Sequence, residues 1–137
     1  MSTIPDIRAV LFDLDGTLLD TLTDLAESMN AVLTGLGFPA HPRDAYRYFV
    51  GDGLEILASR VLPEANRNQA MIQRCATGMR DEYQGRWSDQ TKPYEGIAEL
   101  LDALTSRRLS LNILSNKPDD FTRLMVNYFL NFRNCRF

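Results

Sequence analysis

Apolar residues at the start of the chain follow first a strand-like and then a helical pattern. Residues 7–14 form a short apolar run that ends at Asp13 and Leu14, and an acid and a glycine follow at residues 15 and 16. This pattern is typical of a parallel strand that is buried on both faces. From Leu22 to Leu36 the apolar positions recur at steps of three and four residues, which predicts an amphipathic helix that Gly37 closes. A strand followed by a helix is therefore expected.

Residues 38 to 91 show only helical patterns, separated by turns. Breaks are expected at His41-Pro42, at the Gly-Asp-Gly sequence of residues 51–53, and at Pro63. A longer helix is predicted after Pro63, over about residues 64–87. Residues 92–96 (Lys-Pro-Tyr-Glu-Gly) predict a turn.

The remainder of the chain returns to alternating helix and strand. A helix is predicted over residues 97–104, a second apolar strand over 109–115, and a further helix that Pro118 opens at its first position. The whole order predicts an α/β fold in which two strands pair in parallel and a long all-helical segment is inserted between them. Only two strands are evident.

Composition limits the classes of function. The chain has 137 residues, of which 45% are hydrophobic and 24% charged, as expected for one globular domain or a core with a small insert. The net charge is −3 without a basic run, which gives no reason to expect nucleic-acid binding. Without a signal-like leader or a bilayer-length apolar run, we expect a cytoplasmic protein without a membrane partner.

Cysteine and histidine usage excludes further classes of site. Cys75 and Cys135 show no metal or redox spacing, so two free thiols in a reducing cytosol are expected. His41 is the only histidine and lies between prolines in a predicted turn. This excludes a His-based zinc site and a Ser-His triad.

Polar residues follow both predicted strands. Residues 13–17 (Asp-Leu-Asp-Gly-Thr) end the first strand, and residues 115–117 (Ser-Asn-Lys) end the second. Ligands of open parallel sheets bind beyond the carboxyl ends of the strands, so parallel pairing would place these two segments side by side. The alternative for the first segment is a strand followed by a plain acidic turn.

Two aspartates, Asp13 and Asp15, lie two residues apart at the first strand end. Their mutual repulsion is relieved if one of them keeps a proton or if a cation binds between them. Mg²⁺ suits carboxylate and carbonyl oxygens and commonly takes substrate phosphate as a further ligand. An ionised aspartate can attack phosphorus, and a neighbouring carboxyl group with a raised pKa can protonate the leaving oxygen. The pattern therefore indicates phosphate-transfer chemistry.

The segment of residues 10–20 resembles the first motif of the haloacid dehalogenase superfamily. The helix after it, the turn of residues 50–54, and residues 92–96 and 112–118 resemble the phosphoglycolate phosphatase branch. The resemblance implies a partial Rossmann-like core of parallel strands, residues 1–17 and 92–137. It also implies an inserted all-helical cap, residues 18–91.

The resemblance implies a role for each matching position. Asp13 would be the nucleophile and a Mg²⁺ ligand, and Asp15 the general acid/base that gives the metal its backbone carbonyl. Ser115, with Asn116 beside it, would bind a phosphoryl oxygen; a plain helix N-cap is the alternative for Ser115. Thr17 is a further candidate for phosphate binding and can also hydrogen-bond locally to hold the loop. The implied substrate is a small phosphorylated metabolite, with 2-phosphoglycolate the best single guess.

Other polar and aromatic residues have simpler interpretations. Lys117 could contact phosphate or be an exposed lysine, and residues 51–53 could line a substrate loop or form only a turn. Solvated helix faces are expected at Arg43, Arg47, Arg107 and Arg108, and packing at Tyr46, Tyr48, Phe49 and Trp87.

Two motifs that the resemblance implies are absent from the sequence. The superfamily uses a downstream lysine and further acids, but no lysine follows Lys117 and no acid follows Asp120. We therefore expect a truncated or frameshifted reading of a longer enzyme, with impaired turnover. The alternatives are a catalytically inactive fragment with at most weak metal or phosphate binding, and a sugar-phosphate mutase. The oligomeric state stays open.

Overall fold

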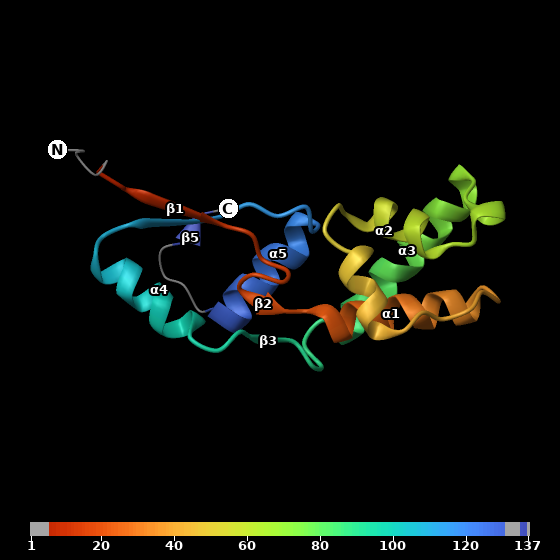
Figure 1. Cartoon of the computed structure of the whole chain (residues 1–137), viewed down its shortest axis with the longest axis horizontal. Coiled ribbons are helices and arrows are strands. Elements are labelled where there is room, and N and C mark those ends of the chain that lie inside the picture. The colour runs from red at the N-terminus through yellow and green to blue at the C-terminus, as the bar shows by residue number, and fades with distance from the viewer. Residues whose placement is uncertain (1–5, 131–134, 137) are drawn as a thin grey trace.

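A small parallel sheet forms one end of the molecule (Figure 1). The computed structural model describes residues 6–130 and 135–136. Strand β1 (Ala9–Phe12) pairs in parallel with β4 (Ser110–Ile113), from Ala9 opposite Ser110 to Phe12 opposite Ile113. The predicted parallel pair is confirmed. The expectation of only two strands is wrong, because β5 (Cys135–Arg136) pairs in parallel with the other edge of β4; two residues are too few to form a sequence pattern.

Only one face of this sheet is covered within the described residues. Val10 and Phe12 pack against the core together with side chains of α4 (Ile97–Ser106). On the opposite face, Leu11 is 61% exposed and Leu114 is 66% exposed. The prediction that the first strand is buried on both faces is therefore wrong. A continuous apolar run shows only that the strand's residues are apolar. Whether both faces of the strand are covered depends on which other elements of the fold pack against them.

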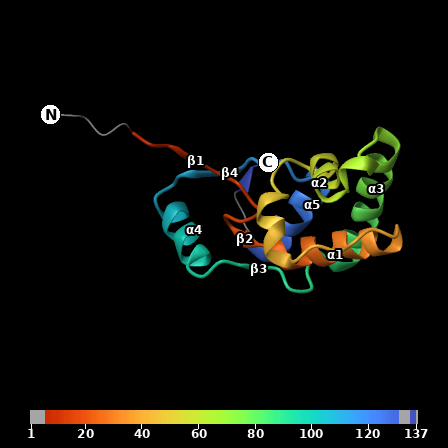
Figure 2. The same ribbon diagram turned by 45° about the vertical axis from the view of Figure 1, so that its right-hand side comes forward.

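Helices gather at the other end of the molecule, where α1 and α3 lie along each other in both views (Figures 1 and 2). The elements of this helical unit are α1 (Leu22–Gly35), η1 (Arg43–Tyr48), α2 (Leu54–Val61), η2 (Glu64–Asn66) and α3 (Gln69–Arg86). The predicted start of the long helix after Pro63 is wrong, because a separate short turn, η2, precedes α3. Asn68 caps α3 by accepting a hydrogen bond from Met71 N at 2.9 Å, so the preceding turn is separate.

Two short antiparallel strands join the helical unit to the sheet. Strand β2 (Leu19–Asp20) pairs with β3 (Lys92–Pro93), and the Tyr94 amide continues the pairing by donating to the Leu18 carbonyl at 3.1 Å. The predicted turn over residues 92–96 is therefore wrong at its first two residues. The segment that leaves the sheet for the helical unit and the segment that returns from it are therefore hydrogen-bonded to each other. This pairing fixes the two ends of the molecule relative to one another at their junction.

Beyond β4 the chain turns back through a short helix, α5 (Asp119–Met125), that continues as a π-helical turn, η3 (Val126–Leu130). Pro118, which was predicted to be the first position of this helix, is its N-cap, so α5 begins one residue later than predicted. The start of α5 therefore lies directly after residues 115–117.

Buried side chains form one continuous core that includes both ends of the molecule. Tyr46 is fully buried, but Tyr48 is 82% exposed, so the packing predicted for Tyr48 is wrong. His41 Nε2 lies 2.8 Å from the Val61 carbonyl, and its ring packs edge-on against Phe49. These contacts agree with a structural histidine. No helix in the described part of the chain has the length and apolarity needed to cross a bilayer.

Cys75 should react very slowly with thiol reagents in the native state. Its side chain is fully buried and unpaired with another cysteine, its Sγ lies 3.5 Å from Met29 Sδ, and burial raises its pKa to about 11. We expect alkylation by iodoacetamide at pH 8 to be at least about a hundredfold slower than in urea. Mass spectrometry of a Cys135→Ser variant measures this rate.

The same raised pKa predicts the sign of a pH effect on stability. The unfolded thiol ionises before the folded one, so the contribution of Cys75 to stability is complete below pH 9 and is lost as the pH rises toward 11. Equal native and unfolded alkylation rates would contradict the burial of this thiol.

Candidate active site

The loop after β1 carries the two aspartates of the predicted motif. Asp13 is exposed, and its Oδ1 accepts a hydrogen bond from Leu14 N at 2.8 Å. Gly16 adopts a left-handed conformation with φ of 76°, and its amide donates to the Leu19 carbonyl at 2.9 Å. Glycine takes this conformation without steric cost. The turn therefore leaves Asp13 and Asp15 at the carboxyl end of the strand.

The loop after β4 brings Ser115 to the same edge. Parallel pairing of β1 with β4 places residues 13–17 and 115–117 beside each other, as predicted. Ser115 Oγ accepts a hydrogen bond from the Lys117 amide at 3.1 Å, which tightens the turn before α5. Since Pro118 is the N-cap of α5, the interpretation of Ser115 as that helix's N-cap is wrong.

A cavity of about 510 Å³ lies where this sheet edge faces the helical unit. It brings together four of the five predicted site residues, namely Asp13, Asp15, Ser115 and Asn116. Thr17 is exposed and does not line the cavity; its amide donates to the Leu14 carbonyl at 3.3 Å within the turn. The predicted phosphate contact of Thr17 stays a prediction.

Asn116 links the sheet edge to the helical unit. Its Nδ2 donates to the Gly51 carbonyl at 2.8 Å, and both Gly51 and Gly53 line the cavity. Asp52, between them, forms an ion pair with Arg60 at 2.6 Å. The residues 51–53 therefore form a wall of the cavity as well as a turn.

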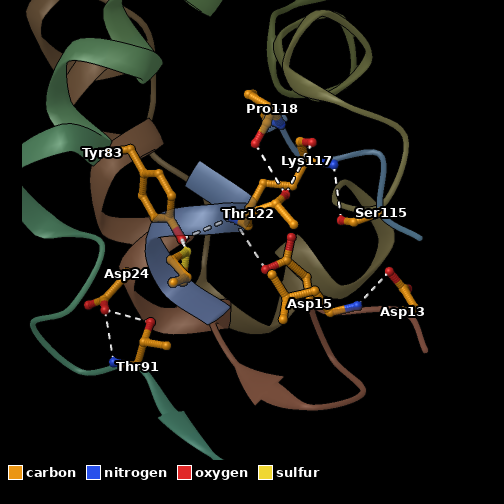
Figure 3. A network of polar contacts seen from close by, with 11 residues as sticks. Asp13, Asp15, Asp24, Tyr83, Thr91, Ser115, Lys117, Pro118 and Thr122 are labelled. Atoms are coloured by element: carbon orange, nitrogen blue, oxygen red, sulfur yellow. Dashed lines mark hydrogen bonds and ion pairs between the residues drawn. The ribbon is translucent and has the colours of Figure 1, made fainter. Parts of the chain in front are cut away.

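Lys117 is deeply buried between the two ends of the molecule (Figure 3). Its side chain is 4% exposed, so the alternative of an exposed lysine is wrong. The Nζ atom lies 3.3 Å from Asp15 Oδ1 and donates to the Tyr83 hydroxyl at 3.0 Å. Burial lowers the pKa of Lys117, and the charge of Asp15 opposes this shift. Asp15 Oδ1 is buried, and the Lys117 ammonium is its charge partner.

Tyr83 comes from α3 and was not singled out by the sequence. Its hydroxyl donates to Met125 Sδ at 3.4 Å, and its ring packs edge-on against Phe121, with centroids 5.1 Å apart. Burial raises the pKa of Tyr83, and the charges of Asp15 and Asp24 raise it further. The phenol therefore stays protonated and can act as a hydrogen-bond donor.

Two arginines for which solvated faces were predicted are exposed, as expected, and also line the cavity. Arg43 and Arg47 come from η1, and both lie beside Asp44, at 2.9 Å and 3.8 Å respectively. Tyr94, which follows β3, also lines the cavity; burial and the charge of Asp20 raise its pKa, while Arg47 lowers it. The four-residue spacing of Arg43 and Arg47 was the signal in the sequence that could have indicated a shared position at the cavity. A solvated helix face shows the same spacing, so the two interpretations could not be separated.

The donor atoms at this edge suit a hard divalent cation. Asp13 has a carboxylate whose second oxygen accepts no hydrogen bond from the described residues, and Asp15 lies two residues further along the same loop. The described residues contain no cluster of three or more His, Cys, Asp or Glu side chains that could hold a metal. Mg²⁺ is commonly bound by one or two protein oxygens together with water and substrate phosphate, so the donor set fits this ion.

A family model described as haloacid dehalogenase-like hydrolase matches residues 10–131. The chain is also similar to phosphoglycolate phosphatases. It is 34% identical over 135 residues to the one from Caulobacter vibrioides, covering 93% of this chain and 55% of that protein. It is 31% identical over 119 residues to the one from Thiobacillus denitrificans, covering 85% and 52%. The chain thus spans about half the length of these relatives.

Solved structures share the fold. A haloacid dehalogenase-like family hydrolase from Streptococcus pneumoniae aligns with a TM-score of 0.82 over 96% of this chain and 61% of that chain, at 24% identity. At this identity the likeness shows the fold alone.

Proposed function

Because the chain belongs to the haloacid dehalogenase-like hydrolase family, we propose that it carries the site of a Mg²⁺-dependent phosphatase acting on a small phosphorylated metabolite. The best candidate substrate is 2-phosphoglycolate, since the relatives above are phosphoglycolate phosphatases. The observation that carries the proposal is the cavity in which Asp13 and Asp15 face Ser115 and Asn116.

In the proposed reaction, Asp13 is the nucleophile. An ionised carboxylate oxygen attacks phosphorus without prior deprotonation, so an aspartyl-phosphate bond forms as the bond from phosphorus to the ester oxygen breaks. The hydrogen bond from Leu14 N to Asp13 Oδ1 holds the carboxylate in one orientation. Ser115 and Asn116 lie at the neighbouring strand end, where a hydroxyl and an amide can donate to phosphoryl oxygens.

Asp15 is the proposed general acid and base. In its protonated form it gives its proton to the departing alkoxide, which leaves the carboxylate that the Lys117 ammonium pairs with; it then takes a proton from the water that hydrolyses the aspartyl-phosphate, so the site returns to its starting state. Mg²⁺, held by Asp13 and the Asp15 carbonyl, would stabilise negative charge on the phosphoryl group. With two protein ligands at this edge, we expect weak binding and a need for millimolar Mg²⁺ rather than trace metal.

We further propose that residues 18–91 form a cap over a core of residues 1–17 and 92–137. The paired strands β2 and β3 lie at both proposed boundaries, and the helical unit supplies Gly51, Gly53 and Tyr83 to the cavity wall. A cap in this position would exclude water from the phosphoryl group. Residues 1–5, 131–134 and 137 of the proposed core lie outside the described residues.

Phosphate release from the purified 137-residue chain tests the proposed activity. With excess Mg²⁺, we expect measurable release from 2-phosphoglycolate and from p-nitrophenyl phosphate, its complete loss in EDTA, and its recovery when Mg²⁺ is restored. Glucose 1-phosphate is the comparison substrate: its conversion to glucose 6-phosphate instead of free phosphate would favour a mutase. Absence of release from both esters at saturating Mg²⁺ would favour an inactive chain.

A further inference from the structure

Lys117 joins three elements that are far apart in the sequence. Its backbone follows β4, its Nζ lies 3.3 Å from Asp15 after β1, and the same Nζ donates to the hydroxyl of Tyr83 in α3 at 3.0 Å. The ammonium also lies 4.4 Å from the centroid of the Tyr83 ring. One atom therefore contacts both the carboxylate of the sheet edge and the helical unit (Figure 3).

The environment of Nζ makes these contacts interdependent. A buried ammonium is stable only when charged and hydrogen-bonding partners replace its water. Among the described residues, Asp15 and Tyr83 are the partners that the structure shows for Nζ. Removing the Tyr83 hydroxyl would leave the ammonium with Asp15 and the face of the aromatic ring, but without a hydrogen-bond acceptor on the helical unit, and water would then compete for it.

Tyr83 itself is positioned by both ends of the molecule. It belongs to the helical unit, yet its ring packs on Phe121 and its hydroxyl contacts Met125, both in α5. Arg80, one turn earlier in α3, forms an ion pair with Asp120 at the start of α5. If the helical unit swings away from the sheet edge, Tyr83 must leave Nζ.

We propose that Lys117 is a positioning residue that orients the Asp15 carboxylate only while Tyr83 is docked against it. With the helical unit in place, Nζ is held between the two groups and the side chain of Asp15 has one preferred orientation. With the unit displaced, Nζ is hydrated and Asp15 loses that orientation. This inference rests on the proposed function, because it assigns Asp15 the proton transfer to the leaving oxygen.

Leaving-group dependence tests the role of Lys117 in turnover. A poorly oriented acid slows the cleavage of an alkyl ester, whose leaving oxygen needs a proton, more than that of an aryl ester with a good leaving group. For Lys117→Met and Tyr83→Phe we expect kcat/KM to fall about tenfold or more on 2-phosphoglycolate and less than about threefold on p-nitrophenyl phosphate. The loss of kcat/KM in the double variant should be no larger than that in the worse single variant, because both changes break the same chain of contacts from Tyr83 through Lys117 to Asp15.

The controls separate positioning from damage to the fold. Lys92→Met removes the other lysine of the chain, which is exposed, and Tyr48→Phe removes an exposed hydroxyl. Both should leave kcat/KM unchanged on either ester. Equal losses on the two esters, or losses that multiply in the double variant, would overturn the proposal.

Lysine labelling tests the contact without any turnover. Lys92 and Lys117 are the only lysines, so an amine-reactive reagent and peptide mass spectrometry report both side chains in one experiment. In the wild type Lys117 should react far more slowly than exposed Lys92. Tyr83→Phe should raise the rate at Lys117 about fivefold or more, as its partner is lost, with Lys92 as the internal reference.

The two experiments fail in different ways. If the wild type releases no phosphate but labelling behaves as expected, the proposed activity fails and the Tyr83–Lys117 contact stands as a structural link. If labelling of Lys117 is unchanged by Tyr83→Phe, or equals that of Lys92 in the wild type, the positioning role of Lys117 is wrong even when the chain is an active phosphatase.

Discussion

Asp13→Asn should reduce Mg²⁺-dependent phosphate release by about a thousandfold or more, as losses of a catalytic nucleophile commonly do. The asparagine oxygen carries no charge, so it is a poor nucleophile and a weaker metal ligand than a carboxylate. The same oxygen can still accept the hydrogen bond from Leu14 N, so the loop should keep its conformation. Initial rates on 2-phosphoglycolate measure the loss.

The matched control for this variant is Asp102→Asn, on the exposed side of α4. It makes the same chemical change outside the cavity and should leave the rate unchanged. Thermal unfolding of both variants checks that neither is destabilised. A residual Asp13→Asn rate within about tenfold of the wild type would show that another group attacks phosphorus.

Asp24→Ala should destabilise the fold by about 3 kcal/mol, because it leaves buried donors without an acceptor. Asp24 is 1% exposed and lies in the first turn of α1. Its carboxylate accepts hydrogen bonds from the Gln90 amide at 2.9 Å and from the Thr91 amide and hydroxyl at 2.8 and 2.7 Å. Urea unfolding, followed by circular dichroism, measures the loss in unfolding free energy.

The loss at Asp24 would be a large share of the total, since domains of this size are stable by only about 5–15 kcal/mol. Glu27→Ala is the control: Glu27 accepts from the Gln90 side chain at 3.0 Å but is exposed, so its loss should cost less than about 0.5 kcal/mol. Similar costs for both variants would contradict a specific role for the buried carboxylate. Asp24 ties α1 to the segment that returns to β3, so it braces the connection between the two ends of the molecule.

The parallel pair and the inserted helices could be predicted because their signals are local. An apolar run that ends in Asp13, or the repeated apolar positions along α1, can be recognised without knowledge of the rest of the chain. Gly37, with φ of 82°, closes α1 as predicted for the same reason. The residues that line the cavity were predicted mainly where they directly follow a strand, and residues 51–53 were offered as a possible substrate loop.

Apart from residues 51–53, the residues that reach the cavity from the helical unit could not be predicted. Tyr83 lies within α3, where its pattern is that of any core aromatic residue, and Arg43 has the pattern of a solvated face. Their position depends on how η1 and α3 dock against the sheet edge. The burial of Lys117 depends on the same docking, so its two alternative interpretations could not be separated in the sequence.

The sequence by itself determined the type of fold and the chemistry of the strand ends. The signals for these features are the spacing of apolar residues, the positions of glycines and the pair of aspartates, and each of them can be recognised within a few neighbouring residues. Only the tertiary structure decided that Lys117 is buried between Asp15 and Tyr83, that Asp24 clamps the return segment, and that Leu11 stays exposed. Each of these depends on contacts between segments 34 or more residues apart, or on a face that no described element covers. Burial and charge pairing are properties of the packed chain, which a linear pattern does not contain.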